Sequence, residues 1–224
     1  MNSTMEQIKD FLIVGGPVVW ILLGFSTIAV TIFFVKLWQL AMLRAESRKT
    51  VDKALDAWRA RDIDGALAML SDKRPVESIV AYSMDAMRQA NREVATIREE
   101  AERRALNTLH DLRSFLRPLE IIGSLSPLLG LLGTVLGMIT AFQQMEGAGA
   151  QVDPSVLSGG IWQALLTTAV GIAVAIPVVA MHAWLERKVE RVAHNMNDAV
   201  TQVFTSKEGE RLAAVAAREV LHAA

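Results

Sequence analysis

Two threonines are the residues of this chain best placed to do chemistry in apolar surroundings. Thr134 and Thr168 each lie in a long uncharged run and share a helix face with small residues. If the runs are antiparallel helices, Thr134 lies roughly 12 Å and Thr168 roughly 10 Å from the same side of the apolar layer. A lone threonine in such a helix usually bonds to its own backbone. Two at matched depth favour a shared polar contact surface.

Carboxylates are missing from the same runs. A proton path through a membrane usually contains a carboxylate or histidine at depth, yet no Asp or Glu lies inside any run, and His182 stands near the end of one. If protons move here, the carboxylate must come from another polypeptide. The chain has no cysteine, no zinc motif, no glycine-rich phosphate loop and no serine–histidine–acid arrangement. We therefore expect no enzyme activity, no metal and no cofactor.

Three apolar runs must position these threonines. Each reaches the length of about 20 residues that a helix needs to cross a bilayer, and none contains Asp, Glu, Lys or Arg. The runs are Phe11–Val35, Ile121–Phe142 and Ile161–Ala183. They predict an all-helical membrane protein whose transmembrane helices cover 11–36, 119–142 and 161–184. Lys36 and Trp38 are predicted to be interfacial anchors at the end of the first span.

Basic residues predict the orientation of the spans. Fifteen Lys and Arg lie between Arg44 and Pro118, whereas Gln143–Gly160 has none. Cytoplasmic segments carry the excess of basic residues in membrane proteins. The expected cytoplasmic parts are 37–118, a helical domain, and 185–224, a C-terminal helix and tail; the expected outer parts are the N-terminus 1–10 and the loop 143–160.

The cytoplasmic part is predicted to be helical. The stretch Glu93–Leu116 lacks Gly and Pro and is rich in strong helix formers, and only Pro118 separates it from the second span. The third span should continue through Leu185–Phe204, where apolar residues form a stripe. We expect these two spans to extend as long helices into a cytoplasmic bundle. The charge runs there are solvated helix faces, so no nucleic-acid partner is expected.

Small residues recur along one face of the second and third spans. Such stripes let helix backbones approach closely within a membrane. They are Gly123, Gly130, Gly133 and Gly137 in the second span, and Ala164, Gly171 and Ala175 in the third. The stripes predict either a tightly packed helix pair within one chain or self-association of several copies into a ring.

Two motifs resemble signatures of a known family. The stretch Pro127–Ile139 (PLLGLLGTVLGMI) resembles the second-span signature of the MotA/TolQ/ExbB proton-channel family, and Gly160–Pro177 (GIWQALLTTAVGIAVAIP) resembles its third-span signature. Three spans with one large cytoplasmic segment are similar to the ExbB/TolQ branch, since a MotA-type subunit would have four spans.

The resemblance implies a motor subunit in a bacterial inner membrane. It implies a homo-oligomeric ring, commonly a pentamer, around the helices of an ExbD- or TolR-like partner that supplies a proton-carrying aspartate. Proton flow would then drive work on a TonB- or TolA-like protein across the periplasm. The family's two pore threonines fall on Thr134 and Thr168, and Gln163 and Thr167 are expected to line the same pore. Gln163 stands where the family often has Glu, so no acid titrates there.

Three functions stay open at this point. The first is an ExbB-like subunit that powers TonB-dependent import through the outer membrane. The second is a TolQ-like subunit of the Tol envelope-integrity system. The third is a non-conducting membrane scaffold, which the carboxylate-free spans and Gln163 would also fit.

Overall fold

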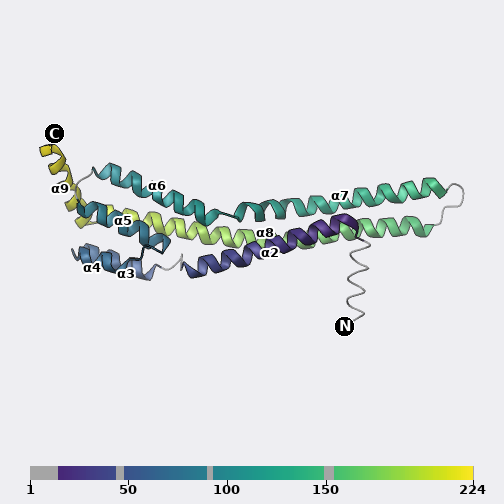
Figure 1. The fold of residues 1–224 in the computed structure, drawn as a ribbon, viewed down its shortest axis with the longest axis horizontal. Coiled ribbons are helices and arrows are strands. Elements are labelled where there is room, and N and C mark those ends of the chain that lie inside the picture. The colour runs from purple at the N-terminus through teal and green to yellow at the C-terminus, as the bar shows by residue number, and fades with distance from the viewer. Residues whose placement is uncertain (1–14, 44–47, 90–92, 149–153, 224) are drawn as a thin grey trace. The chain divides into compact units, whose positions relative to one another are not determined.

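The described part of the chain is entirely helical. The computed structural model describes residues 15–43, 48–89, 93–148 and 154–223, and these form the helices α2 to α9 without a strand (Figure 1). They group into two compact units. The first unit contains the described residues up to Val35 and those from Phe115 to Trp184; the second contains Lys36–Ser114 and the residues from Leu185 onward.

Three helices are long and apolar enough to cross a membrane, as expected from the sequence. They are α2 (Gly16–Met42), α7 (Leu116–Ala148) and α8 (Pro154–Thr205). Residues 11–14, where the first span was predicted to begin, lie outside the described residues. Large apolar side chains on the outer faces of these helices are exposed, among them Trp20, Leu128 and Ile176. An exposed apolar surface of this kind suits a hydrocarbon solvent.

In the first unit, α7 and α8 pack side by side and antiparallel. The position of a Cβ on Gly137 is 3.3 Å from Cβ of Ala164, and that of a Cβ on Gly160 is 2.4 Å from Cβ of Ala141. Helix α2 runs parallel to α8: Gly16 lies against Gln163, and the rings of Phe33 and Trp184 have centroids 6.0 Å apart. Small residues thus bring α7 and α8 together, while larger side chains separate α2 from α8.

Helix α8 is a single helix of 52 residues, as expected for a third span that continues beyond the membrane. At 1.5 Å per residue it is about 78 Å long. Pro177 lies inside it, and Pro127 inside α7, without ending either helix. Prolines are tolerated in membrane helices because neighbouring helices and polar side chains can satisfy the backbone groups they release.

The expected continuous helix from the cytoplasmic segment into the second span is wrong. α6 (Val94–Arg113) ends at Ser114, whose backbone is extended, and Phe115 takes a left-handed conformation with φ of 64°. A left-handed residue cannot continue a right-handed helix. α7 then begins at Leu116, and Pro118 sits in its first turn, where the missing N–H has no helical partner to lose.

Four further helices complete the second unit. They are α3 (Lys49–Arg59), α4 (Ile63–Met69), α5 (Pro75–Gln89) and α9 (Lys207–Ala223). Trp58 of α3 is fully buried, and its Nε1 donates to the carbonyl oxygen of Val203 at 3.3 Å and to Oγ of Ser206 at 2.9 Å. Arg48 also pairs with Asp198 of α8. These contacts attach α3 to the C-terminal end of α8.

The joint between α8 and α9 contains a buried carboxylate. Glu208 is 2% exposed and accepts hydrogen bonds from Nε of Arg211 at 3.0 and 3.1 Å. Arg61 approaches the same carboxylate at 3.5 Å. Hydrogen bonding to the Arg211 guanidinium, with its charge and that of Arg61, holds the pKa of Glu208 below its usual range.

We expect Glu208→Gln to loosen α9. Because the folded pKa of Glu208 is lowered, its carboxylate stabilises the fold above the unfolded pKa of about 4.3, and this contribution is lost as the pH falls through the folded value. The neutral variant should lose about 1 kcal/mol of local stability at pH 7, since both arginines are half or more exposed. Hydrogen exchange of the α9 amides measures it.

The matched control for this prediction is Glu210→Gln, which neutralises an exposed carboxylate one residue beyond Gly209. Its α9 amides should exchange as in the wild type. The difference between wild type and Glu208→Gln should shrink as the pH falls below about 4.3, because the Glu208 carboxylate then becomes protonated. A difference that stays the same down to the acid limit of the folded protein would show that the charge of Glu208 is not its cause.

Candidate functional site

The carbonyl oxygen of Gly130 is the centre of a polar contact between α7 and α8. Thr168 donates its hydroxyl to this oxygen at 3.1 Å, and Thr167 approaches it at 3.3 Å while also donating to the carbonyl of Ala164 at 2.7 Å. Gly130 and Thr167 are buried, whereas Thr168 is half-buried. The contact exists because neither Gly130 nor Gly171 has a side chain to keep the helices apart.

Thr134 lies one turn along α7 from Gly130. Its hydroxyl donates to the carbonyl of Leu131 at 2.6 Å, and its side chain is half-exposed. Since Thr168 bonds to Gly130, the structure places the two threonines at neighbouring levels of the helix pair. Each hydroxyl uses its hydrogen inside the protein and keeps oxygen lone pairs that can accept a further hydrogen bond.

Close backbone approach explains the small residues of the stripe. A Cβ on Gly130 would be 2.9 Å from the carbonyl oxygen of Thr167 and 3.1 Å from Cα of Thr168. A Cβ on Gly171 would be 2.6 Å from the carbonyl oxygen of Ser126. Real Cβ atoms do not approach backbone so closely without displacing it. The crossing of α7 and α8 at this level therefore requires glycine on both helices.

The rest of the stripe lies along the same contact. Gly133 faces the side chain of Thr167, Gly123 faces Val179, and Ala164 and Ala175 are buried. These contacts are all made within one chain, which is one of the two arrangements expected from the sequence. The role of the same residues between copies in a ring stays a prediction.

Gln163 and Thr167 are placed differently from Thr134 and Thr168. The Gln163 side chain faces α2, with its Nε2 3.4 Å from where a Cβ on Gly16 would stand. Thr167 is 2% exposed and is covered by Gly130 and Gly133 of α7. The geometry gives Thr167 a packing role in this chain and leaves Thr134 and Thr168 as the half-exposed hydroxyls of the pair.

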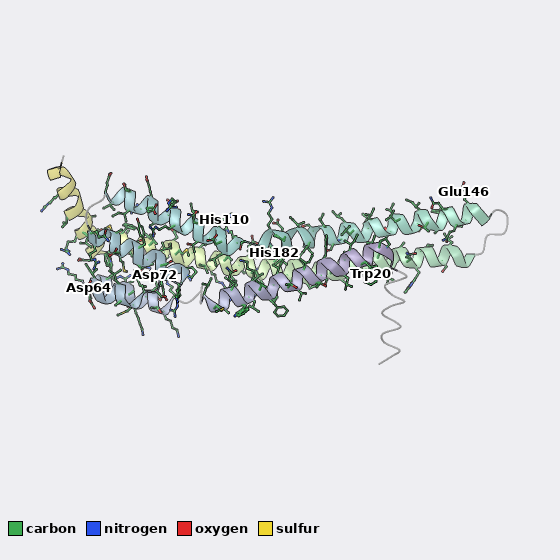
Figure 2. All side chains as sticks on the ribbon, viewed as in Figure 1. Trp20, Asp64, Asp72, His110, Glu146 and His182 are labelled. Atoms are coloured by element: carbon green, nitrogen blue, oxygen red, sulfur yellow. The ribbon has the colours of Figure 1, made fainter. Side chains whose placement is uncertain are left out.

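Two titratable residues of these helices are distant in sequence from the threonines: Glu146 comes 12 residues after Thr134, and His182 comes 14 residues after Thr168. Figure 2 shows Glu146 near the end of α7 and His182 part-way along α8. Among the residues that the structure describes, no three His, Asp or Glu side chains lie together in a way that could hold a metal ion. In the second unit, α6 and α8 border a groove of about 520 Å³, lined in part by Leu106, Leu109 and Phe204.

The position of the Lys36 side chain differs from the prediction made from the sequence. It was predicted to be an interfacial anchor, but its side chain is buried, at 1% exposed, and bonds to Leu112 and Ser114. Trp38, predicted for the same role, is 69% exposed. A lysine that ends an apolar run gives no sign of a partner 76 residues away, so only the folded structure could reveal this contact.

Three helices long and apolar enough to cross a membrane, two of them joined by an uncharged polar contact, define an all-helical membrane protein. The chain belongs to the MotA/TolQ/ExbB proton channel family, whose family model matches residues 71–198. It is a proton-channel subunit of the ExbB/TolQ kind, in the inner membrane.

Several proteins are similar over most of the chain. Biopolymer transport protein exbB1 of Vibrio cholerae is 31% identical over 201 residues, which cover 87% of this chain and 86% of that protein. A putative biopolymer transport protein ExbB-like 1 of Synechocystis is 32% identical, covering 79% and 69%. The Tol-Pal system protein TolQ of Haemophilus influenzae is 26% identical over 220 residues, covering 92% and 95%.

Proposed function

We propose that this chain is an ExbB-like subunit of an inner-membrane motor that converts proton motive force into work on a TonB-like protein. An ExbD-like partner supplies the aspartate that takes up and releases protons. The observation that carries the proposal is the pair of half-exposed hydroxyls, Thr134 and Thr168, at neighbouring levels of α7 and α8, within the apolar runs 121–142 and 161–183 that contain no Asp or Glu. Similarity to exbB1 along most of both chains supports it.

The threonine hydroxyls suit a partner carboxyl group. Both donate to backbone carbonyls, so their oxygens accept the proton of a neutral carboxylic acid or a hydrogen of a water molecule. Either hydroxyl can also rotate and donate to a carboxylate. The two protonation states of a partner aspartate therefore find hydrogen bonds at one level, which lowers the cost of changing charge inside the membrane.

The proposed assembly is a homo-oligomeric ring, with five copies the expected number. The N-terminus and the loop between α7 and α8 lie in the periplasm, and the basic second unit with the C-terminus lies in the cytoplasm. The ring surrounds the partner's membrane helices, so Thr134 and Thr168 of every copy face them. The exposed apolar faces of α2, α7 and α8 supply surface both for lipid and for neighbouring copies.

A TolQ-like subunit is the second candidate. The TolQ protein of Haemophilus influenzae matches over a larger share of both chains than exbB1 does, although its identity is lower. In that case the partners are TolR-like and TolA-like proteins.

Proton flux in proteoliposomes tests the proposal. The chain is reconstituted alone, with an ExbD-like protein and with a TolR-like protein encoded near it, and acidification is followed with an internal pH dye under an applied potential. We expect flux only with the ExbD-like protein. Flux only with the TolR-like protein would move the assignment to the Tol system. A complex that forms with either partner but conducts no protons would support the scaffold.

A further inference from the structure

The ammonium group of Lys36 donates hydrogen bonds to three acceptors within the part of the chain that the structure describes. Its Nζ donates to Oε1 of Gln39 at 2.8 Å, to the carbonyl oxygen of Leu112 at 3.1 Å and to Oγ of Ser114 at 3.1 Å. The side chain is 1% exposed. A lysine ammonium has three donors and no acceptor, so this arrangement satisfies the whole group. The proposed proton path uses none of these atoms.

Two of the acceptors lie at the C-terminal end of α6. The last carbonyls of a helix have no helical partner and carry partial negative charge. Lys36 places a positive charge there, and Asp111 in the last turn of α6 adds a negative charge nearby. The chain leaves the helix immediately afterwards, through Ser114 and the left-handed Phe115. Lys36 thus binds the point where α6 stops.

A buried lysine is not expected to increase the stability of the fold by itself. Removing an ammonium group from water costs several kcal/mol, and apolar residues of similar size often stabilise a core as well or better. A buried charge with fixed partners does define one arrangement, because every other arrangement leaves it without them. The geometry of Lys36 therefore points to positioning.

We propose that Lys36 is a positioning residue that fastens the end of α2 to the end of α6. Gln39 belongs to α2, one turn beyond Lys36, so the ammonium group joins the two helices through side chains of one and the backbone of the other. The end of α2 from Lys36 onward and α6, both in the second unit, then move together. An arginine is not equivalent, because its planar guanidinium group with five donors does not fit a buried site arranged around a compact ammonium group.

The absence of cysteine makes a distance measurement direct. Met42 is 72% exposed on α2, and Asn107 is exposed on α6; both belong to the second unit with Lys36. Spin labels on Met42→Cys and Asn107→Cys report the distance between the end of α2 and the C-terminal half of α6 in the full-length protein. We expect a narrow distance distribution in the doubly labelled protein that keeps Lys36. When Lys36→Met is added, the population at a second distance should rise about tenfold relative to the main population. This factor is the scale of one lost charge-assisted hydrogen bond.

Two further variants keep the test decisive. Lys53→Met removes an exposed lysine of α3 and should leave the distribution narrow. Ser114→Ala removes a single acceptor, so it folds even if Lys36→Met does not, and should give a smaller second component. A narrow distribution in both Lys36→Met and Ser114→Ala would overturn the proposal. Equal broadening in Lys53→Met would also overturn it, because the effect would then follow from loss of charge anywhere.

Partner-dependent proton flux provides a second readout, and only this readout rests on the proposed function. We expect Lys36→Met to reduce flux severalfold while the complex with the partner still forms. A second distance component with unchanged flux would overturn the role of Lys36 in transport. If the wild type itself conducts no protons, the proposed function fails, whereas the distance measurement still decides whether Lys36 fastens α2 to α6.

Discussion

Gly130→Ala is expected to separate α7 from α8 and to leave little folded protein. The added Cβ would stand 2.9 Å from the carbonyl oxygen of Thr167, 3.1 Å from Cα of Thr168 and 3.3 Å from Cα of Gly171. All three are backbone atoms, so no side chain can rotate to make room. Relief requires the helices to move apart, which breaks the hydrogen bonds from Thr167 and Thr168 to Gly130.

The expected loss is about 3 kcal/mol or more, the upper part of the range for overpacking, because backbone and hydrogen bonds change together. The measurement is unfolding of the detergent-purified protein by SDS titration, followed by circular dichroism. Gly24→Ala is the matched control: it adds the same methyl group to a membrane helix where nothing lies within 4 Å. It should be neutral or slightly stabilising, since alanine favours a helix.

Other glycines of the stripe should follow the order of their contacts. Gly171→Ala should be as damaging as Gly130→Ala, because its Cβ would be 2.6 Å from the carbonyl of Ser126. Gly137→Ala should be milder, since its nearest neighbours on Ala164 lie at 3.3 and 3.4 Å. If Gly130→Ala unfolds no more readily than Gly24→Ala, α7 and α8 do not cross as closely as the structure shows.

Much of the fold follows from patterns within single segments. The apolar runs predicted the three long helices, and the stripe of glycines predicted that α7 would pack closely against a partner. The stripe could not tell whether that partner lay in the same chain or in another copy, because both contacts need the same small residues. Helix rise alone predicted that Thr134 and Thr168 lie at similar levels, and the structure places them one turn apart along the helix pair, since Thr168 bonds to Gly130.

Features set by contacts distant in sequence could not be predicted. Phe115 has no sequence property that favours a left-handed conformation. The sequence suggested Pro118 as the one interruption before the second span, whereas the helix breaks at Ser114 and Phe115 and Pro118 lies inside α7. The buried position of Lys36 depends on the end of a helix 76 residues away. Both features occur at the same junction, where tertiary contacts override what the local sequence prefers.

Thr168→Val is expected to abolish most partner-dependent proton flux while keeping the helix pair intact. Valine keeps the branched shape but has no oxygen, so the α7–α8 contact loses one hydrogen bond and little volume. Gly130 still accepts from Thr167, and α7 keeps its helical hydrogen bonds. A partner carboxyl group, however, loses a hydrogen bond at the depth where it changes charge. We expect a decrease of about tenfold or more, since 1.4 kcal/mol corresponds to one decade.

The same reasoning covers Thr134→Val, and the double variant should retain least flux. Thr168→Ser keeps the hydroxyl and should keep most of the flux, which separates the oxygen from the shape of the side chain. Thr140→Val controls for loss of any hydroxyl from α7, because Thr140 is exposed and donates only to Leu136 in its own helix. Flux is compared at equal amounts of reconstituted complex.

Undiminished flux in Thr134→Val/Thr168→Val, with the partner still bound, would place the proton path elsewhere. A loss in Thr168→Ser equal to that in Thr168→Val would instead make packing the cause, because serine lacks only the methyl group.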